Sequence, residues 1–186
     1  MFIISCQYDQ SQVTANSTSI PVTLLSTPLC IDPKGNETLT QTKTEPTNPL
    51  YSLDKQQSSL VYYDKNTIVL TMPYWVKVTN SSVEDSELKK HSFVLSYDPT
   101  TMKDTDTKLK LYISHVVDDA GETVTRSNFT YAYRAYSIRD ALTVFKEKTG
   151  KLPKYLELTA KTNSSKDELK EESGETSVEY DYAFTE

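Results

Sequence analysis

Glycine occurs only four times in this chain of 186 residues, as Gly35, Gly121, Gly150 and Gly174. Loops that cradle phosphate groups or hold a nucleophile on a sharp turn need glycine, because their backbone takes a positive φ or approaches a ligand closely. Each of the four lies where an ordinary turn is expected. None remains for a phosphate loop, a dinucleotide fingerprint or a nucleophile elbow, so we do not expect an enzyme of these classes.

The remaining composition predicts a small, β-rich core in a single domain. Hydrophobic residues make up 37% of the chain, while serine and threonine together occupy 45 positions, so apolar side chains are scarcer than in an average globular domain. Thirteen tyrosines partly offset this shortage, because a tyrosine ring fills apolar space while its hydroxyl group tolerates water. The length suits one domain that spans residues 1–186.

Short alternating apolar segments predict β-strands along most of the chain. After a first strand at the apolar N-terminus, they cover residues 20–25, 60–63, 67–72, 75–79, 92–97, 108–117, 123–133, 154–161 and 177–184. The segments 60–63 and 67–72 are spaced for a hairpin. A second hairpin is predicted from 108–117 to 123–133, with its turn at 118–121. The expected fold is mostly β: an antiparallel β-sandwich of the jelly-roll or immunoglobulin-like kind.

One α-helix is predicted near residues 138–149. Four apolar residues recur there at helical spacing: Ile138, Ala141, Leu142 and Phe145. Ser137 is the expected N-cap, with Asp140 completing a capping box, and Gly150 is the expected stop. Farther on, residues 162–176 are polar and highly charged, and we expect a loop there, with at most a short helix around 166–171.

The longest stretch without a strand or helix pattern runs from residue 27 to residue 58. It contains half of the eight prolines of the chain, and structureless segments of this length are uncommon inside a compact domain. Two interpretations stay open. The segment is either a surface loop or an extended arm that contacts a neighbouring subunit, with Leu50, Tyr51 and Leu53 as its apolar anchors.

The charge pattern argues against two classes of partner. The net charge is −6 and no run of lysine or arginine exceeds two residues, so neither a nucleic-acid footprint nor docking on an anionic membrane is expected. The apolar runs are too short for membrane insertion. The N-terminal segment 1–6 lacks the basic start and length of a secretory signal, and Cys6 and Cys30 are accordingly expected to be reduced thiols.

The titratable residues suggest no catalytic residue, cofactor or metal site. His91 and His115 are the only histidines, and neither has a cysteine or second histidine at metal-ligand spacing. We expect both to be solvated or locally hydrogen-bonded. The acidic pairs in residues 104–106 and 118–119 lack the remaining ligands of a calcium loop, and turn chemistry explains them better.

An aromatic stripe on one predicted strand is open to three interpretations. Phe129, Tyr131 and Tyr133 alternate along it and therefore share one face. A buried stripe belongs to the core, which is the default in a chain short of aliphatic residues. An exposed stripe is a subunit interface or a platform on which sugar rings stack.

Two classes of function fit these observations. We expect a non-enzymatic structural subunit, with a virus or phage particle (a capsid, decoration or tail-type protein) as its setting. Its partners are then protein subunits, in a homo-oligomer or a larger assembly, contacted through the arm and the tyrosine-rich strands. The alternative is an extracellular carbohydrate- or protein-binding β-sandwich. Five Asn-X-Ser/Thr sequons, where chance gives roughly two, and the aromatic stripe favour it.

Overall fold

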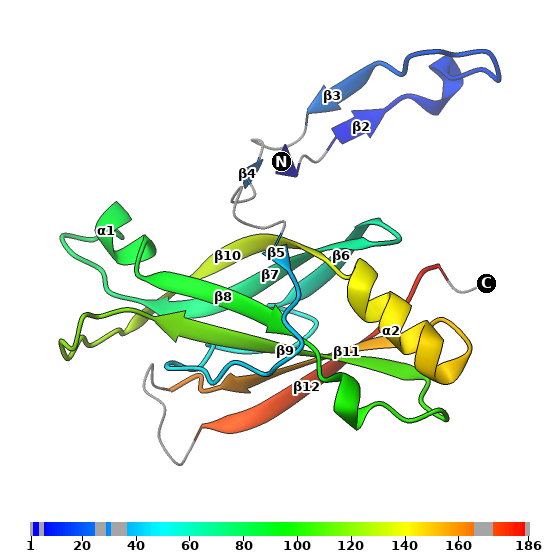
Figure 1. The fold of residues 1–186 in the computed structure, drawn as a ribbon. Helices are drawn as coiled ribbons and strands as arrows, with labels where there is room; N and C mark the ends of the chain where they lie inside the picture. Colours follow the sequence, from blue (N-terminus) through cyan, green and yellow to red (C-terminus); the bar gives the residue numbers. More distant parts are fainter. Residues whose placement is uncertain (1, 4–5, 25–28, 31–36, 166–172, 185–186) are drawn as a thin grey trace.

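The computed structural model describes residues 2–3, 6–24, 29–30, 37–165 and 173–184 (Figure 1). Its strands are β1 (Phe2–Ile3), β2 (Cys6–Tyr8), β3 (Val22–Leu24), β4 (Leu29–Cys30), β5 (Glu37–Thr38), β6 (Ser59–Asp64), β7 (Thr67–Val76), β8 (His91–Ser96), β9 (Lys108–Val117), β10 (Asn128–Ser137), β11 (Tyr155–Thr162) and β12 (Gly174–Asp181). Its helices are α1 (Asp85–Leu88), α2 (Arg139–Thr149) and the 3₁₀ turns η1 (Gln10–Gln12) and η3 (Pro99–Thr101). None of the helices in these ranges has the length and apolar character of a bilayer-spanning helix.

Two four-stranded sheets form a β-sandwich, which confirms the predicted fold class. One sheet has the order β5-β10-β7-β6 and the other the order β12-β11-β9-β8. Most neighbouring strands are antiparallel, but β11 runs parallel to β9 and β5 runs parallel to β10. A single buried cluster unites the facing sides of both sheets, for example Leu70 and Met72 of β7 with Leu111 of β9 and Leu158 of β11.

The predicted hairpin between residues 60–63 and 67–72 is confirmed as β6 and β7. The sequence predicts two separate strands at residues 67–72 and 75–79. The structure has one strand there up to Val76, because β7 continues through Pro73. The carbonyl oxygen of Pro73 accepts a hydrogen bond from the Tyr51 N–H group at 3.0 Å. The proline nitrogen faces the same edge, where β6 has already ended, so its missing N–H group costs the sheet no hydrogen bond.

The second predicted hairpin, between residues 108–117 and 123–133, is wrong. Strand β9 pairs with β8 and β11, whereas β10 pairs with β7 in the other sheet. Residues 118–127 therefore cross from one sheet to the other. Local turn residues at 118–121 predict a change of direction, but they do not decide which strand becomes the neighbour.

Helix α2 forms where the sequence predicts it, and its apolar face is buried, with Phe145 fully inside the core. Gly150 ends the helix with φ = 75°, and its N–H group donates to the Lys146 carbonyl oxygen. The predicted Ser137 cap is wrong, because Ile138 is the N-cap and has no side-chain capping bond. The Ile138 N–H group instead donates to the Asn66 carbonyl oxygen at 2.7 Å, which ties the start of the helix to the β6–β7 turn.

The described part of the predicted arm, residues 37–58, lies against the sandwich of this chain. Strand β5 extends one sheet beside β10, and Thr40 then bridges to Ser96 of β8 in the other sheet. Leu50 bridges to Tyr74 of β7 and to Thr162 of β11. The segment thus joins the two sheets at both points instead of extending freely, while residues 27–28 and 31–36 lie outside the described residues.

The remaining N-terminal segment forms a short ribbon. Strands β2 and β3 pair in antiparallel fashion, and Figure 1 shows them beyond the sandwich. The ribbon exposes four large apolar side chains, namely Tyr8, Ile20, Val22 and Leu24, each with at least half of its surface in solvent.

The loop predicted at 162–176 is shorter than expected, because β11 ends at Thr162 and β12 begins at Gly174. The short helix considered around 166–171 lies outside the described residues.

Candidate functional site

The aromatic stripe lies on the outer face of β10. Ala132 and Tyr136 of the same strand are buried in the core. Because side chains alternate along a strand, Phe129, Tyr131 and Tyr133 point the opposite way. Phe129 keeps 41% and Tyr131 keeps 39% of its surface exposed, and Tyr133 is half-buried. The core interpretation of the stripe is therefore wrong for Phe129 and Tyr131, which leaves the two surface interpretations.

Tyr51, a residue from a distant part of the chain, extends the stripe. Its ring stacks on Phe129 with centroids 4.2 Å apart, and it meets Trp75 edge-on at 5.1 Å. Phe129 in turn contacts Tyr131 at 5.9 Å, and Tyr131 contacts Tyr133 at 6.5 Å. We call Tyr51, Phe129, Tyr131 and Tyr133 the aromatic row. The structure thus brings four of the six predicted interface residues together.

The other two predicted interface residues, Leu50 and Leu53, do not reach the surface. They are 1% and 3% exposed and belong to the core cluster. Leu50 lies between the sheets at their junction, where its N–H group donates to the Lys161 carbonyl oxygen at 2.9 Å. Both leucines anchor residues 50–53 to this chain and so hold Tyr51 in its place in the row.

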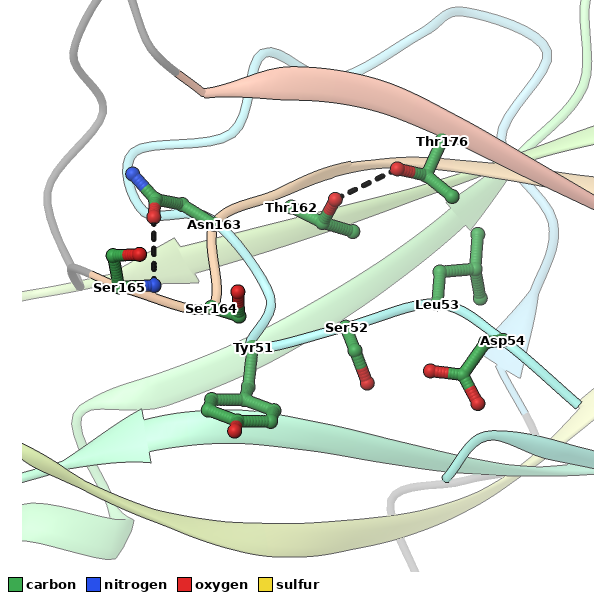
Figure 2. A pocket seen from close by; sticks show the side chains of 9 residues that line it. All are labelled: Tyr51, Ser52, Leu53, Asp54, Thr162, Asn163, Ser164, Ser165 and Thr176. Carbon is green, nitrogen blue, oxygen red and sulfur yellow. Dashed lines mark hydrogen bonds between the residues drawn. The ribbon is translucent and has the colours of Figure 1, made fainter. Parts of the chain in front are cut away.

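A polar pocket of about 670 Å³ begins at Tyr51 (Figure 2). One wall is the segment 51–54, and the opposite wall comes from the end of β11, the residues after it and the start of β12. The lining residues, which we call the Tyr51 pocket, are Tyr51, Ser52, Leu53, Asp54, Thr162, Asn163, Ser164, Ser165 and Thr176. Because Tyr51 belongs to both features, the pocket adjoins the aromatic row.

Hydrogen bonds hold the walls of the pocket in position. The Asn163 N–H group donates to the Leu50 carbonyl oxygen at 3.0 Å, and the Trp75 indole N–H group donates to the Asn163 carbonyl oxygen at 2.9 Å. On the other wall, Asp54 Oδ1 accepts the backbone N–H groups of Gln56 and Gln57, each at 2.8 Å. The pocket is therefore built on backbone that is already ordered, which lowers the entropic cost of binding a ligand.

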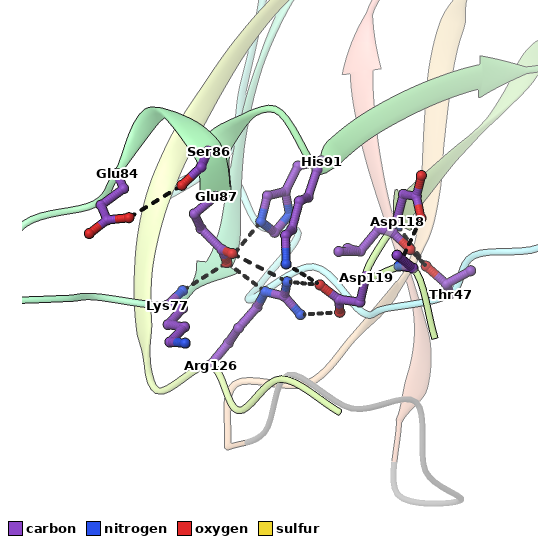
Figure 3. A network of polar contacts seen from close by, with 12 residues as sticks. Thr47, Lys77, Glu84, Ser86, Glu87, His91, Asp118, Asp119 and Arg126 are labelled. Atoms are coloured by element: carbon purple, nitrogen blue, oxygen red, sulfur yellow. Dashed lines mark hydrogen bonds and ion pairs between the residues drawn. The ribbon is translucent and has the colours of Figure 1, made fainter. Parts of the chain in front are cut away.

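A second polar site is buried where α1 leads into β8 (Figure 3). His91 Nδ1 and His115 Nε2 lie 2.9 Å apart, and His91 Nε2 lies 3.2 Å from Glu87 Oε1. Arg126 donates to Glu87 Oε1 through Nε at 2.7 Å and to Asp119 Oδ1 through a terminal nitrogen at 2.7 Å. We call these five residues the histidine network. Of the two expected states, solvated or locally hydrogen-bonded, the solvated one is wrong, because His91 is 6% and His115 is 1% exposed. Both rings are hydrogen-bonded instead.

Burial determines the protonation of this network. It lowers the pKa of His91 and lowers the pKa of His115 to about 3. His115 Nδ1 also faces the Pro49 carbonyl oxygen at 3.2 Å. Two neutral rings carry two N–H groups for three contacts, to Glu87, to each other and to Pro49, so one contact then lacks a proton. Arg126 compensates the Glu87 charge and lowers the pKa of that carboxyl group against the opposing effect of burial.

Three residues of the acidic pairs, Asp106, Asp118 and Asp119, serve turns and ion pairs. Asp106 Oδ2 accepts the Lys103 N–H group at 2.9 Å, and Asp118 Oδ1 accepts the Ala120 N–H group at 3.0 Å. Asp119 lies 3.3 Å from Lys90 Nζ besides its contact with Arg126. Within the described part of the chain, no group of three or more His, Cys, Asp or Glu residues is arranged to hold a metal ion.

Sequence reasoning missed the Tyr51 pocket and the histidine network. The pocket joins residues near position 52 to residues near position 163, and the network joins position 87 to position 126. The one local signal is the spacing of Glu87 and His91, which are four residues apart. Such a spacing brings two side chains together on a helical turn, but it does not indicate burial.

Comparisons with known proteins give a fold but no family. No protein-family model matches the chain, and neither does any curated protein. Among solved structures, it is similar to a "putative lipoprotein" from Bacteroides fragilis NCTC 9343, with 29% sequence identity and a TM-score of 0.77 over 100% of this chain and 83% of that one. It is also similar to an uncharacterized protein from Parabacteroides merdae ATCC 43184, with 15% identity and a TM-score of 0.55 over 98% and 82% of the two chains. The second likeness supports the fold alone.

Proposed function

We propose that this protein is a non-enzymatic binding module of a bacterial cell envelope, which recognises its partner through the aromatic row. The exposure of Phe129 and Tyr131 side by side carries the proposal. Adjacent exposed rings on a regular strand are typical of recognition surfaces, because a rigid aromatic side chain buries a large area at a small entropic cost. The extracellular alternative of the sequence analysis is thereby favoured over the assembly function.

The similar lipoprotein supports an envelope location. The virus or phage particle expected from the sequence has no support in either similar structure. In this chain, Cys6 directly follows the small residue Ser5 and the apolar residues Phe2, Ile3 and Ile4. By analogy with the similar protein, we propose that this cysteine carries a lipid.

We therefore assign Cys6 as the tether. A lipid with two acyl chains on the Cys6 sulfur would anchor the protein stably, whereas a single acyl chain binds only marginally. A reduced thiol at Cys6, as the sequence predicts, and a lipidated one differ in a measurable way.

Metabolic labelling tests the tether. The full chain is expressed from its own gene in a bacterial host fed with an alkyne-tagged fatty acid. We expect label on the wild type and on Cys30→Ser, and none on Cys6→Ser. Equal labelling of the two variants, or none on the wild type, contradicts the assignment.

Binding to envelope material tests recognition. Purified protein is mixed with envelope fragments and sedimented, and the double variant Phe129→Ser/Tyr131→Ser is compared with Tyr63→Ser. Tyr63 lies on β6 of the same sheet and is 68% exposed, so it is a matched control for loss of an exposed ring. We expect the double variant alone to stay in solution, and co-sedimentation of all three proteins to the same extent would oppose the proposal.

A second candidate function is the subunit assembly predicted from the sequence. The β2–β3 ribbon favours it, because a two-stranded ribbon is marginally stable by itself and exposes Ile20, Val22 and Leu24. A partner subunit that covers these side chains would stabilise the ribbon. Light scattering of the wild type and of the triple serine variant at these positions tests this candidate: an oligomer that the variant turns into a monomer supports it, and a monomeric wild type opposes it.

A further inference from the structure

We infer that the Tyr51 pocket and the aromatic row form one binding groove for a neutral polysaccharide. This inference rests on the proposed binding function and specifies its ligand. In the groove, one sugar unit occupies the pocket and the following units lie over Phe129 and Tyr131.

The continuity of the two surfaces is the first argument. Tyr51 lines the pocket and stacks on Phe129 at 4.2 Å, and Phe129 contacts Tyr131 at 5.9 Å. A ligand that fills only the pocket leaves the exposed rings uncovered, and a flat apolar ligand on the rings leaves the pocket empty. A chain of repeating units covers both.

The chemistry of the lining is the second argument. A sugar ring presents apolar C–H groups on its faces and hydroxyl groups around its edge, so it needs aromatic faces and hydrogen-bonding groups together. The pocket supplies the hydroxyl groups of Ser52, Thr162, Ser164 and Thr176, the carboxylate of Asp54 and the amide of Asn163 (Figure 2). The hydroxyl and amide groups both donate and accept hydrogen bonds, as a sugar hydroxyl does, whereas the Asp54 carboxylate only accepts them.

The charge of the lining selects a neutral glycan. Asp54 is the one charged residue among the nine that line the pocket. A carboxylate accepts hydrogen bonds from neutral sugar hydroxyls, but it repels the carboxylate of a uronic acid. The backbone bonds from Gln56 and Gln57 already hold Asp54 in place, so its orientation is preorganised for this role.

Calorimetry with defined oligosaccharides tests the inference. The probes are the neutral hexasaccharides of the malto, cello, xylo and manno series, with oligogalacturonate as the acidic comparator. Ser164→Trp fills the pocket from its wall, and Ser92→Trp places the same ring on the exposed face of β8 as a control. Tyr131→Ala tests the row independently of the pocket, and thermal melts verify that each variant is folded.

We expect at least one neutral probe to bind, with binding lost in Ser164→Trp, weakened about tenfold or more in Tyr131→Ala, and unchanged in Ser92→Trp. Binding that survives in Ser164→Trp, or tighter binding of oligogalacturonate, overturns the neutral groove. If no probe binds and protease treatment of the envelope fragments abolishes the row-dependent sedimentation, the ligand is a protein: the glycan inference fails and the proposed function stands. If sedimentation does not depend on the row, the proposed function itself fails.

Discussion

His115 of β9 is buried against the segment around Pro49, and its protonation affects the stability of the fold. Burial lowers its pKa from 6.5 to about 3, and the charge of Arg126 acts in the same direction. At His91, the carboxylates of Glu87 and Asp119 oppose the effect of burial on the pKa. The folded protein therefore holds neutral imidazole at pH values where the unfolded chain is already protonated.

Stability should decrease as the pH falls below about 6.5. The unfolded chain binds protons that the folded state excludes, so each neutral histidine costs up to about 1.4 kcal/mol of unfolding free energy per pH unit. The loss continues toward pH 3, the folded pKa of His115. Between pH 6.5 and 5 the change in stability comes almost entirely from the histidines. Glu87 and Asp119 have lowered pKa values, so their contribution to stability changes only at pH values below the ordinary pKa of a carboxyl group.

Urea unfolding at several pH values measures this slope. His115→Gln should reduce it, because the variant lacks the group that titrates. A flat wild-type profile from pH 6.5 to 5 would contradict the prediction. It would mean that the folded state takes up as many protons as the unfolded chain over this range.

At the scale of elements, α2 shows how a local pattern and the core agree. The helix begins within one residue of its predicted start and ends at the predicted residue, since its apolar stripe repeats every three or four positions and Gly150 permits the left-handed ending. Its cap was mispredicted because the Ile138 N–H group finds the Asn66 carbonyl oxygen. Asn66 is distant from Ile138 in the sequence, whereas capping rules consider only residues next to the helix end.

Phe145→Ala should destabilise the protein by roughly 3–5 kcal/mol, because it leaves a cavity under the helix. Thr143→Ala on the exposed side of α2 is the control and should change stability by less than about 0.5 kcal/mol. Thermal or urea unfolding measures both. Similar values for the two variants would mean that α2 does not depend on its buried face.

At the scale of the whole molecule, residues 37–58 connect the two sheets of the sandwich. Leu50 joins β7 to β11 through its backbone and fills the core with its side chain. An arm that served only a neighbouring subunit would leave the stability of the isolated domain unaffected. The observed contacts instead make this segment part of the domain itself.

Leu50→Ala should therefore lower the unfolding free energy by about 2–5 kcal/mol. Leu88→Ala is the matched control, because Leu88 is 39% exposed at the end of α1, and its effect should be small. Urea unfolding at a protein concentration low enough to keep the chain monomeric separates the two. A Leu50 variant as stable as the wild type would restore the arm interpretation.

The sequence alone predicted most strands and helix α2, because apolar periodicity and turn residues act over a few neighbouring positions. It also selected Tyr51, Phe129, Tyr131 and Tyr133 as candidates. Only the tertiary structure decided that β10 pairs with β7 and not with β9, that the side chain of Leu50 is buried, and that Tyr51 stacks on Phe129 beside a pocket. These outcomes depend on which distant surfaces bury one another best, and the free energy of that choice belongs to the whole core rather than to any local segment.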